Sequence, residues 1–175
     1  HVYTNKFLFE ILDDGSLNDI TPGDYPLLGN DLFITPNGRY LISYWGSLQI
    51  YERDIETGEL TVKGYSAETP SHVMLSVDGK FIYYSESKYL YRRAFDQETG
   101  VYGEEELLLY IPGIKINLLT QSNTGRYIFA SGDVYEREVK ALEYDAQSGA
   151  ISVVASTLRT TVSDGVYRLS SMPRQ

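Results

Sequence analysis

Ile-Thr-Pro-Asn-Gly-Arg-Tyr-Leu-Ile-Ser-Tyr, at residues 34–44, is the stretch that decides the fold. It predicts a strand, a tight turn at Gly38 and a second strand, because glycine accepts the positive φ that tight turns need. Similar stretches occupy residues 75–85, 121–131 and, more weakly, 161–171, so that the turn glycines lie 41, 46 and 40 residues apart. A repeat of this length is typical of the four-stranded blades of a β-propeller. The sequence therefore predicts an all-β propeller.

A second turn recurs in each repeat, farther along the chain. An aspartate stands four residues before a glycine at 54–58, 96–100 and 145–149. Such a carboxylate accepts hydrogen bonds from the backbone amides of its own turn, which predicts a structural role at all three positions. An outer strand is expected after each turn. The repeat predicts a strand even at 105–111, where the local run of glutamates and leucines would also suit a helix.

The repeats divide the chain into blades within one predicted domain, residues 1–175. Whole blades are expected at 31–66, 72–111 and 116–156, and half blades at 1–21 and 160–171. The two half blades are expected to combine into one blade shared between the termini, which is how propellers hide their open edges. Two alternatives fit this pattern: a closed four-bladed ring, or an arc of a larger seven- or eight-bladed ring.

Composition excludes several classes of function. The 175 residues include 15 basic and 24 acidic side chains, for a net charge of −9. Such a charge repels phosphate backbones, so we expect no nucleic-acid partner. There is no cysteine for a disulfide or a thiolate site, and no apolar run as long as a membrane span. No cofactor or metal is predicted, since the phosphate-binding, dinucleotide and calcium-loop motifs are all missing.

The start of the chain bears on the expected compartment. The chain begins at His1 rather than at a methionine, as a mature protein does once its signal has been removed, or as a piece of a longer chain does. A secreted, periplasmic or cell-surface location is therefore favoured over a cytoplasmic one.

The inner turns and the motif Tyr-x-x-Asp-x-x-Thr-Gly-x-Leu at 51–60 resemble those of the lactonase-type and YVTN-type β-propeller family. This resemblance implies a propeller usually seven-bladed and about twice this length. Some members hydrolyse 6-phosphogluconolactone, and others are surface or binding proteins. The lactonase branch tends to carry Pro-Arg-His at the start of an inner strand that faces the central channel. Here Pro70-Ser71-His72 keeps the histidine and lacks the arginine.

Candidate catalytic residues stand seven residues before the turn glycines. Asp31 and His72 hold this position in adjacent blades, and Leu118 and Leu158 hold it in the others. We expect these residues to ring one mouth of the channel, where Asp31 and His72 could act as an acid/base pair on a lactone. The alternative is that His72 bonds a neighbouring backbone group and fills the start of its strand.

Candidate binding residues are aromatic or acidic. Trp45, Tyr44, Tyr83 and Tyr84 lie on second strands, where they pack between blades or, at a rim, stack on a sugar or a peptide. The acidic run Glu104, Glu105 and Glu106 on an outer strand suits either a charged edge that blocks aggregation or a patch for a partner.

The preferred prediction is a non-catalytic binding or assembly module that presents a rim or an outer face to a partner. That partner is a protein, or a second copy that completes or decorates the propeller, or else a small-molecule ligand. The alternative is a lactone hydrolase with His72 and Asp31 at the central channel.

Overall fold

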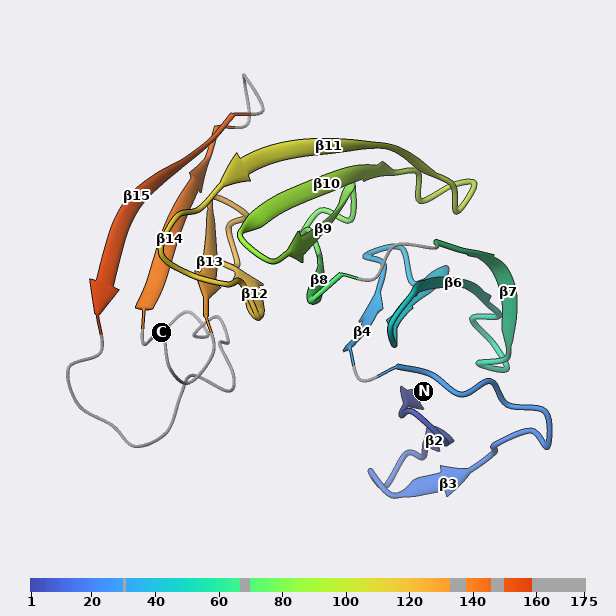
Figure 1. Ribbon diagram of the computed structural model, residues 1–175. Coiled ribbons are helices and arrows are strands. Elements are labelled where there is room, and N and C mark those ends of the chain that lie inside the picture. Colours follow the sequence, from blue (N-terminus) through green and yellow to red (C-terminus); the bar gives the residue numbers. More distant parts are fainter. Residues whose placement is uncertain (30, 67–69, 133–137, 146–149, 159–175) are drawn as a thin grey trace. The chain divides into compact units, whose positions relative to one another are not determined.

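A computed structural model describes residues 1–29, 31–66, 70–132, 138–145 and 150–158. All regular elements in these residues are strands, and antiparallel pairing joins them into separate sheets (Figure 1). No helix in this part of the chain has the length and hydropathy that a membrane crossing requires. The all-β prediction is therefore confirmed.

Three sheets are whole blades, each with four strands in chain order. The first blade holds β4 (Asp31–Ile34), β5 (Tyr40–Tyr44), β6 (Leu48–Arg53) and β7 (Leu60–Tyr65). The second blade holds β8 (His72–Leu75), β9 (Phe81–Glu86), β10 (Tyr89–Phe95) and β11 (Tyr102–Tyr110). The third blade holds β12 (Leu118–Gln121), β13 (Tyr127–Ser131), β14 (Glu138–Tyr144) and β15 (Ile151–Leu158).

The N-terminal sheet has three strands, β1 (Val2–Tyr3), β2 (Leu8–Ile11) and β3 (Leu17–Asp19). The sequence predicted the second and third of these and missed β1, whose two residues show no alternation to detect. The predicted half blade at 160–171 lies outside the described residues. The sharing of a blade between the termini, and the number of blades in the ring, stay predictions.

The inner turns explain why each of the three described repeats has a serine or threonine three residues before its glycine. That hydroxyl accepts a hydrogen bond from the backbone amide five residues on, at 2.9–3.0 Å, and also bonds the side chain two residues on. The glycines then take φ between +71° and +74°. The hydroxyls belong to Thr35, Ser76 and Ser122, and the glycines are Gly38, Gly79 and Gly125.

The chain divides into two compact units. The first unit holds the N-terminal sheet, the first blade and the turn Asp96–Val101, and the second holds the rest of the second blade together with the third. Within the first unit, Tyr40 donates its phenol hydrogen to the carbonyl of Glu98 at 3.2 Å, and Arg39 bonds the same carbonyl at 2.7 Å. The single predicted domain stays a prediction.

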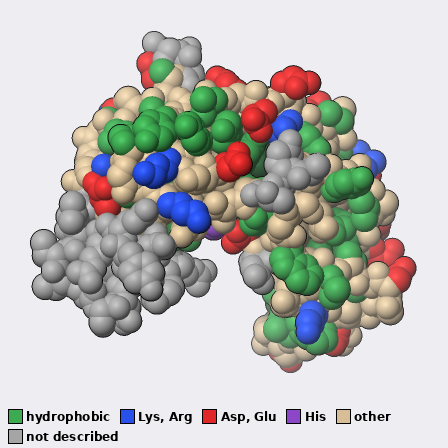
Figure 2. Space-filling view, viewed as in Figure 1, with side chains coloured by type: hydrophobic (Ala, Val, Ile, Leu, Met, Phe, Trp, Pro, Cys, Tyr) green, Lys and Arg blue, Asp and Glu red, His purple; other side chains and the backbone are tan. Residues whose placement is uncertain are grey.

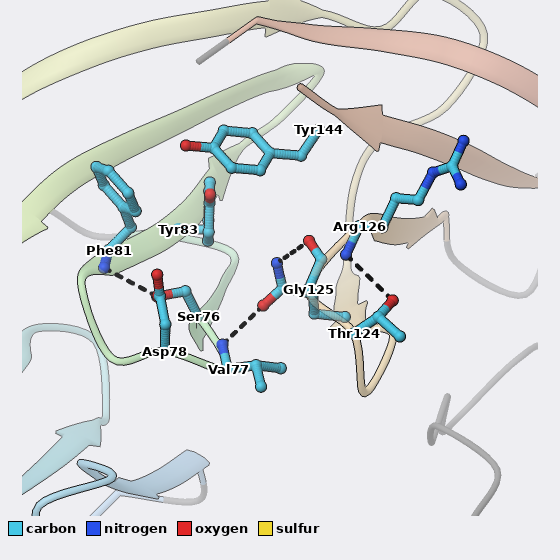
Figure 3. A pocket seen from close by; sticks show the side chains of 10 residues that line it. Ser76, Val77, Asp78, Phe81, Tyr83, Thr124, Gly125, Arg126 and Tyr144 are labelled. Atoms are coloured by element: carbon cyan, nitrogen blue, oxygen red, sulfur yellow. Dashed lines mark hydrogen bonds between the residues drawn. The ribbon is translucent and has the colours of Figure 1, made fainter. Parts of the chain in front are cut away.

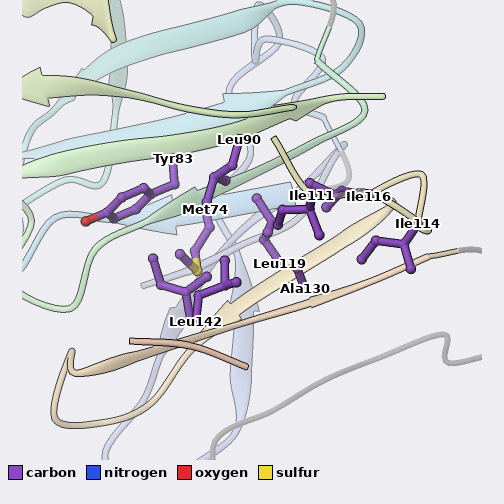
Figure 4. Close-up of a cluster of buried hydrophobic side chains, with 10 residues drawn as sticks. Met74, Tyr83, Leu90, Ile111, Ile114, Ile116, Leu119, Ala130 and Leu142 are labelled. Atoms are coloured by element: carbon purple, nitrogen blue, oxygen red, sulfur yellow. The ribbon is translucent and has the colours of Figure 1, made fainter. Parts of the chain in front are cut away.

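The core of the second unit lies between two facing sheets (Figure 4). Alternate residues of the second blade, Met74, Tyr83 and Leu90, point toward alternate residues of the third, as the period of two requires. All of these side chains are at most 4% exposed. The buried members of the cluster are Met74, Tyr83, Leu90, Ile111, Ile114, Ile116, Leu119, Ile128, Ala130 and Leu142.

Candidate functional site

His72 is the first residue of β8, and its ring is half-buried. Its Nε2 atom lies 3.2 Å from the carbonyl oxygen of Leu119 on β12. Because a carbonyl oxygen can only accept, the ring nitrogen is the donor in this contact. The contact joins the inner strands of two adjacent blades, which gives His72 a structural role. A catalytic role for it stays a prediction.

Asp31 is the first residue of β4 and lies opposite Tyr44 on β5. Burial, with the charge of Asp31 as a smaller cause, raises the pKa of the Tyr44 phenol. Asp31 belongs to the first unit and His72 to the second, so no single unit holds the proposed pair. The acid/base pair therefore remains a prediction.

Three of the four positions that stand seven residues before a turn glycine begin an inner strand, and their expected place around the channel mouth stays a prediction. Asp31, His72 and Leu118 each begin the inner strand of their blade. Leu158 does not: it ends β15, opposite Glu138 of β14. The outer hairpin of the third blade thus pairs for two residues beyond the expected strand end at Ser156. The inner strand predicted at 160–163 lies outside the described residues.

Of the aromatic candidates, only Trp45 is strongly exposed, with 63% of its surface accessible. Tyr44 is half-buried. Tyr83 and Tyr84 are 1% and 5% exposed and belong to the packed part of the second unit. Trp45 is thus the candidate that can meet a partner directly.

The acidic run on β11 faces the arginines of β10. Glu105 lies 3.8 Å from Arg93 and accepts a hydrogen bond from Tyr84, and Glu106 lies 2.7 Å from Arg92. Burial and the bond to Glu105 raise the pKa of Tyr84. Two of the three carboxylates are therefore engaged within the blade, which leaves exposed Glu104 as the part of the run best placed for a partner.

A cavity of about 380 Å³ opens in the second unit, between the β8–β9 turn and the β12–β13 turn (Figure 3). No local motif in the sequence predicts this cavity, because its walls come from segments about 40 residues apart or more. The side chains and turn residues that line it are Ser76, Val77, Asp78, Phe81, Tyr83, Gln121, Thr124, Gly125, Arg126 and Tyr144.

Gln121 joins the two turns beside this cavity. Its Oε1 atom accepts a hydrogen bond from the amide of Val77 at 2.8 Å, and its Nε2 atom donates to the carbonyl of Gly125 at 2.8 Å. The side chain is buried, so both bonds are shielded from water. The two turns that form the cavity are thereby held at a defined separation.

No group of three or more His, Asp or Glu side chains among the residues that the structure describes is gathered closely enough to hold a metal ion.

Several solved structures that share this fold are named as lactonases. The chain superposes on a 6-phosphogluconolactonase-like protein of Bacteroides uniformis (TM-score 0.66, 16% identity), covering 87% of this chain and 51% of that one. The chain also superposes on a protein of Lactobacillus plantarum (TM-score 0.65, 18% identity), and the match covers 87% of this chain and 48% of that one. A periplasmic gluconolactonase of Pseudomonas aeruginosa (TM-score 0.59, 19% identity) is covered to 43%, again by 87% of this chain.

These structures share the fold of this chain but are about twice as long. The fold is a β-propeller, as the turn motifs predicted, and the chain shares it with structures that are named as lactonases. The chain spans about half the length of the solved structures it matches. No protein-family model and no curated protein matches it by sequence.

Proposed function

We propose that this chain is a non-catalytic assembly module whose N-terminal sheet packs against a second copy of the same chain. The observation that carries the proposal is the uneven burial of that sheet. Leu8, on one face, is fully buried. Ile11 and Leu17 form a cross-strand pair on the opposite face and are 54% and 55% exposed. Figure 2 shows hydrophobic side chains gathered over this sheet, at the lower right.

A propeller blade normally buries both faces between its neighbours, and the second blade illustrates this. Val73 and Ile82 on one face, and Met74 and Tyr83 on the other, are all at most 4% exposed. An exposed apolar face is an interaction surface in a soluble protein. The face of Ile11 and Leu17 therefore suits another blade.

The third blade of a second copy is the proposed occupant. On the face of the third blade that packs against the second blade, Leu119, Ile128 and Leu142 are buried. On the opposite face, Phe129 and Ala141 are only half-buried. Two such contacts, each joining the N-terminal sheet of one copy to the third blade of the other, close a ring. The doubled chain would match the length of the solved propellers.

The test is the molar mass of the chain in solution, by light scattering on a sizing column over a range of concentrations. We expect twice the monomer mass of 19.8 kDa. Leu17→Lys should shift the mass toward the monomer, because it places a charge in the apolar contact. Val62→Lys is the matched control, since Val62 is 63% exposed on β7 and takes no part in the contact. A monomer at every concentration would overturn the proposal.

Lactone hydrolysis is the second candidate, favoured by the names of the Bacteroides uniformis and Pseudomonas aeruginosa structures. In that case His72 and Asp31 would serve as acid and base at the channel. The assay is the opening of 6-phosphogluconolactone and of gluconolactone by the wild-type chain and by His72→Ala. Equal rates for the two chains would exclude a catalytic His72. Turnover lost in a folded His72→Ala chain would instead exclude the non-catalytic module.

A further inference from the structure

The cavity between the β8–β9 and β12–β13 turns lies away from His72. β8 begins at His72 and ends at Leu75, and the cavity opens beyond that end, beside the turn that follows. It is formed within the second unit alone. Its volume of about 380 Å³ is within the range of small-molecule sites in proteins. It is therefore a separate place where a ligand could sit.

Three aromatic rings form the apolar wall of the cavity. The ring of Phe81 lies 6.1 Å from that of Tyr83 and 6.4 Å from that of Tyr144, the second pair meeting edge to face. Tyr83 and Phe81 come from β9, and Tyr144 ends β14, so both blades contribute (Figure 3). Rings set at angles to one another offer flat apolar faces to a ligand of ring shape.

The cationic side chains around the cavity are paired with carboxylates. Arg126 lies 2.6 Å from Glu143, and Lys80 lies 3.9 Å from Asp78. Arg92, whose guanidinium stacks on Phe81 at 4.8 Å, is paired with Glu106. Because each positive charge has a negative partner nearby, the site offers no net charge to attract an anion.

Hydroxyl and carboxylate groups complete the lining. Tyr144 brings a phenol, Thr124 brings a hydroxyl, and Asp78 brings a carboxylate, whereas Tyr83 contributes only its nearly buried ring. Burial raises the pKa of Tyr83 to about 12, so its phenol stays protonated at neutral pH. The cavity therefore combines apolar ring faces with hydrogen-bonding groups and an overall neutral charge.

We infer that this cavity binds a neutral pyranose ring, with the apolar C–H face of the sugar on the aromatic wall and its hydroxyls on the polar groups. A pyranose carries hydroxyls around the rim of its ring and has comparatively apolar C–H faces, which matches the lining. A sugar acid fits less well, because its carboxylate would find no unpaired cation. The inference concerns a site distinct from the proposed interface between copies.

The experiment is a titration of the complete chain with methyl glucopyranoside, methyl galactopyranoside and methyl mannopyranoside, followed by two-dimensional NMR of the backbone amides. At least one glycoside should shift the amides of Val77, Thr124 and Gly125, which belong to the two turns. Sodium gluconate is the charge control and should bind at least tenfold more weakly than that glycoside.

Variants separate the cavity from the rest of the unit. Tyr144→Ala removes part of the wall at a half-buried position and should weaken binding at least tenfold. Tyr110→Ala is the matched control, a 49% exposed tyrosine of β11 outside the cavity, and should bind like the wild type. Thermal unfolding checks that both variants fold. The inference is overturned if no glycoside shifts these amides, if gluconate binds more tightly, or if both variants bind equally.

Discussion

The ring of Tyr40 lies against Gly100, so close that a Cβ atom on Gly100 would stand 2.5 Å from the Cε1 atom of the ring. Gly100 also has a φ of +75°, a conformation that side chains disfavour. Gly58 repeats the arrangement with the ring of His1, at 2.8 Å and with a φ of +78°. The glycine of the outer turn thus serves two purposes: it permits the turn, and it leaves room for an aromatic ring.

Gly100→Ala should lower the free energy of unfolding by about 3 kcal/mol, the sum of the left-handed backbone and the clash with Tyr40. Gly15→Ala is the control, because Gly15 has a φ of +81° and nothing within 4 Å of an added Cβ. That variant should lose only about 1 kcal/mol. Urea unfolding measures both, and equal losses would mean that the ring contact adds nothing.

Gln121→Leu should destabilise the second unit by about 2 kcal/mol, because it leaves the Val77 amide and the Gly125 carbonyl without their buried partner. Hydrogen exchange gives the specific readout, since the Val77 amide should exchange faster in the variant. Gln49→Leu changes a half-buried glutamine in the first unit. That variant should leave the exchange rate of the Val77 amide unchanged. If the Val77 amide exchanges as slowly in Gln121→Leu as in the wild type, Gln121 does not hold the two turns together.

Acid should destabilise the protein through its turn aspartates. Backbone amides of Thr57 and Glu56 hold the pKa of Asp54 below its usual value, and the Glu98 amide with the Thr99 hydroxyl does the same for Asp96. A lowered folded-state pKa contributes stability that is present above the ordinary carboxyl pKa of about 3.9. That stability is lost as the pH falls through the folded value.

The melting temperature should therefore fall steeply below pH of about 4. Asp54→Asn combined with Asp96→Asn should flatten this fall. Asp24→Asn removes an exposed carboxylate outside both turns and should leave the profile unchanged. A double variant with the wild-type pH profile would show that these carboxylates are not responsible.

His72→Ala should cost about 1 kcal/mol of unfolding free energy, because it removes the hydrogen bond to the Leu119 carbonyl between adjacent blades. Chemical unfolding followed by circular dichroism measures this loss. Unchanged stability would argue that the contact with Leu119 has no structural weight and would return attention to a role in catalysis.

Trp45→Ala should change the unfolding free energy by less than about 0.5 kcal/mol, because the side chain is 63% exposed. Leu41→Ala is the comparison, because Leu41 is fully buried on β5, the strand that ends just before Trp45. This variant should lose about 3 kcal/mol of unfolding free energy. A large loss for Trp45→Ala would show that the indole packs within the fold rather than facing a partner.

The repeat and its turns were predictable because their determinants are local. Each inner turn needs a serine or threonine, a hydrogen-bonding side chain two residues later, and a glycine directly after that side chain. All three are visible in the sequence. The register of the repeat also identified β11 as a strand despite its run of glutamates and leucines. The pairing of that run with Arg92 and Arg93 could have been found as well, by folding the hairpin about its Asp96–Gly100 turn.

The candidate sites were less predictable because they depend on contacts between repeats. The cavity needs Phe81 and Tyr144 to meet, and Gln121 to reach Val77, across more than 40 residues. No motif marks Gln121, since the equivalent positions in the other blades hold Ile34 and Leu75. The hydrogen bond from His72 to Leu119 could not be predicted from the sequence either, because its acceptor is a backbone carbonyl that any residue would supply.

The docking of Tyr40 on the turn at Asp96–Val101 has a consequence for synthesis on the ribosome. The first blade has all of its own strands once Tyr65 has been made, yet Tyr40, Arg39 and Asn37 bond carbonyls of residues 97 and 98. The ring of Tyr40 can dock only after the chain has been made as far as Glu98, which is 33 residues beyond Tyr65. The first blade would thus be finished by the repeat behind it, and would mature only after the turn of the second blade has been made.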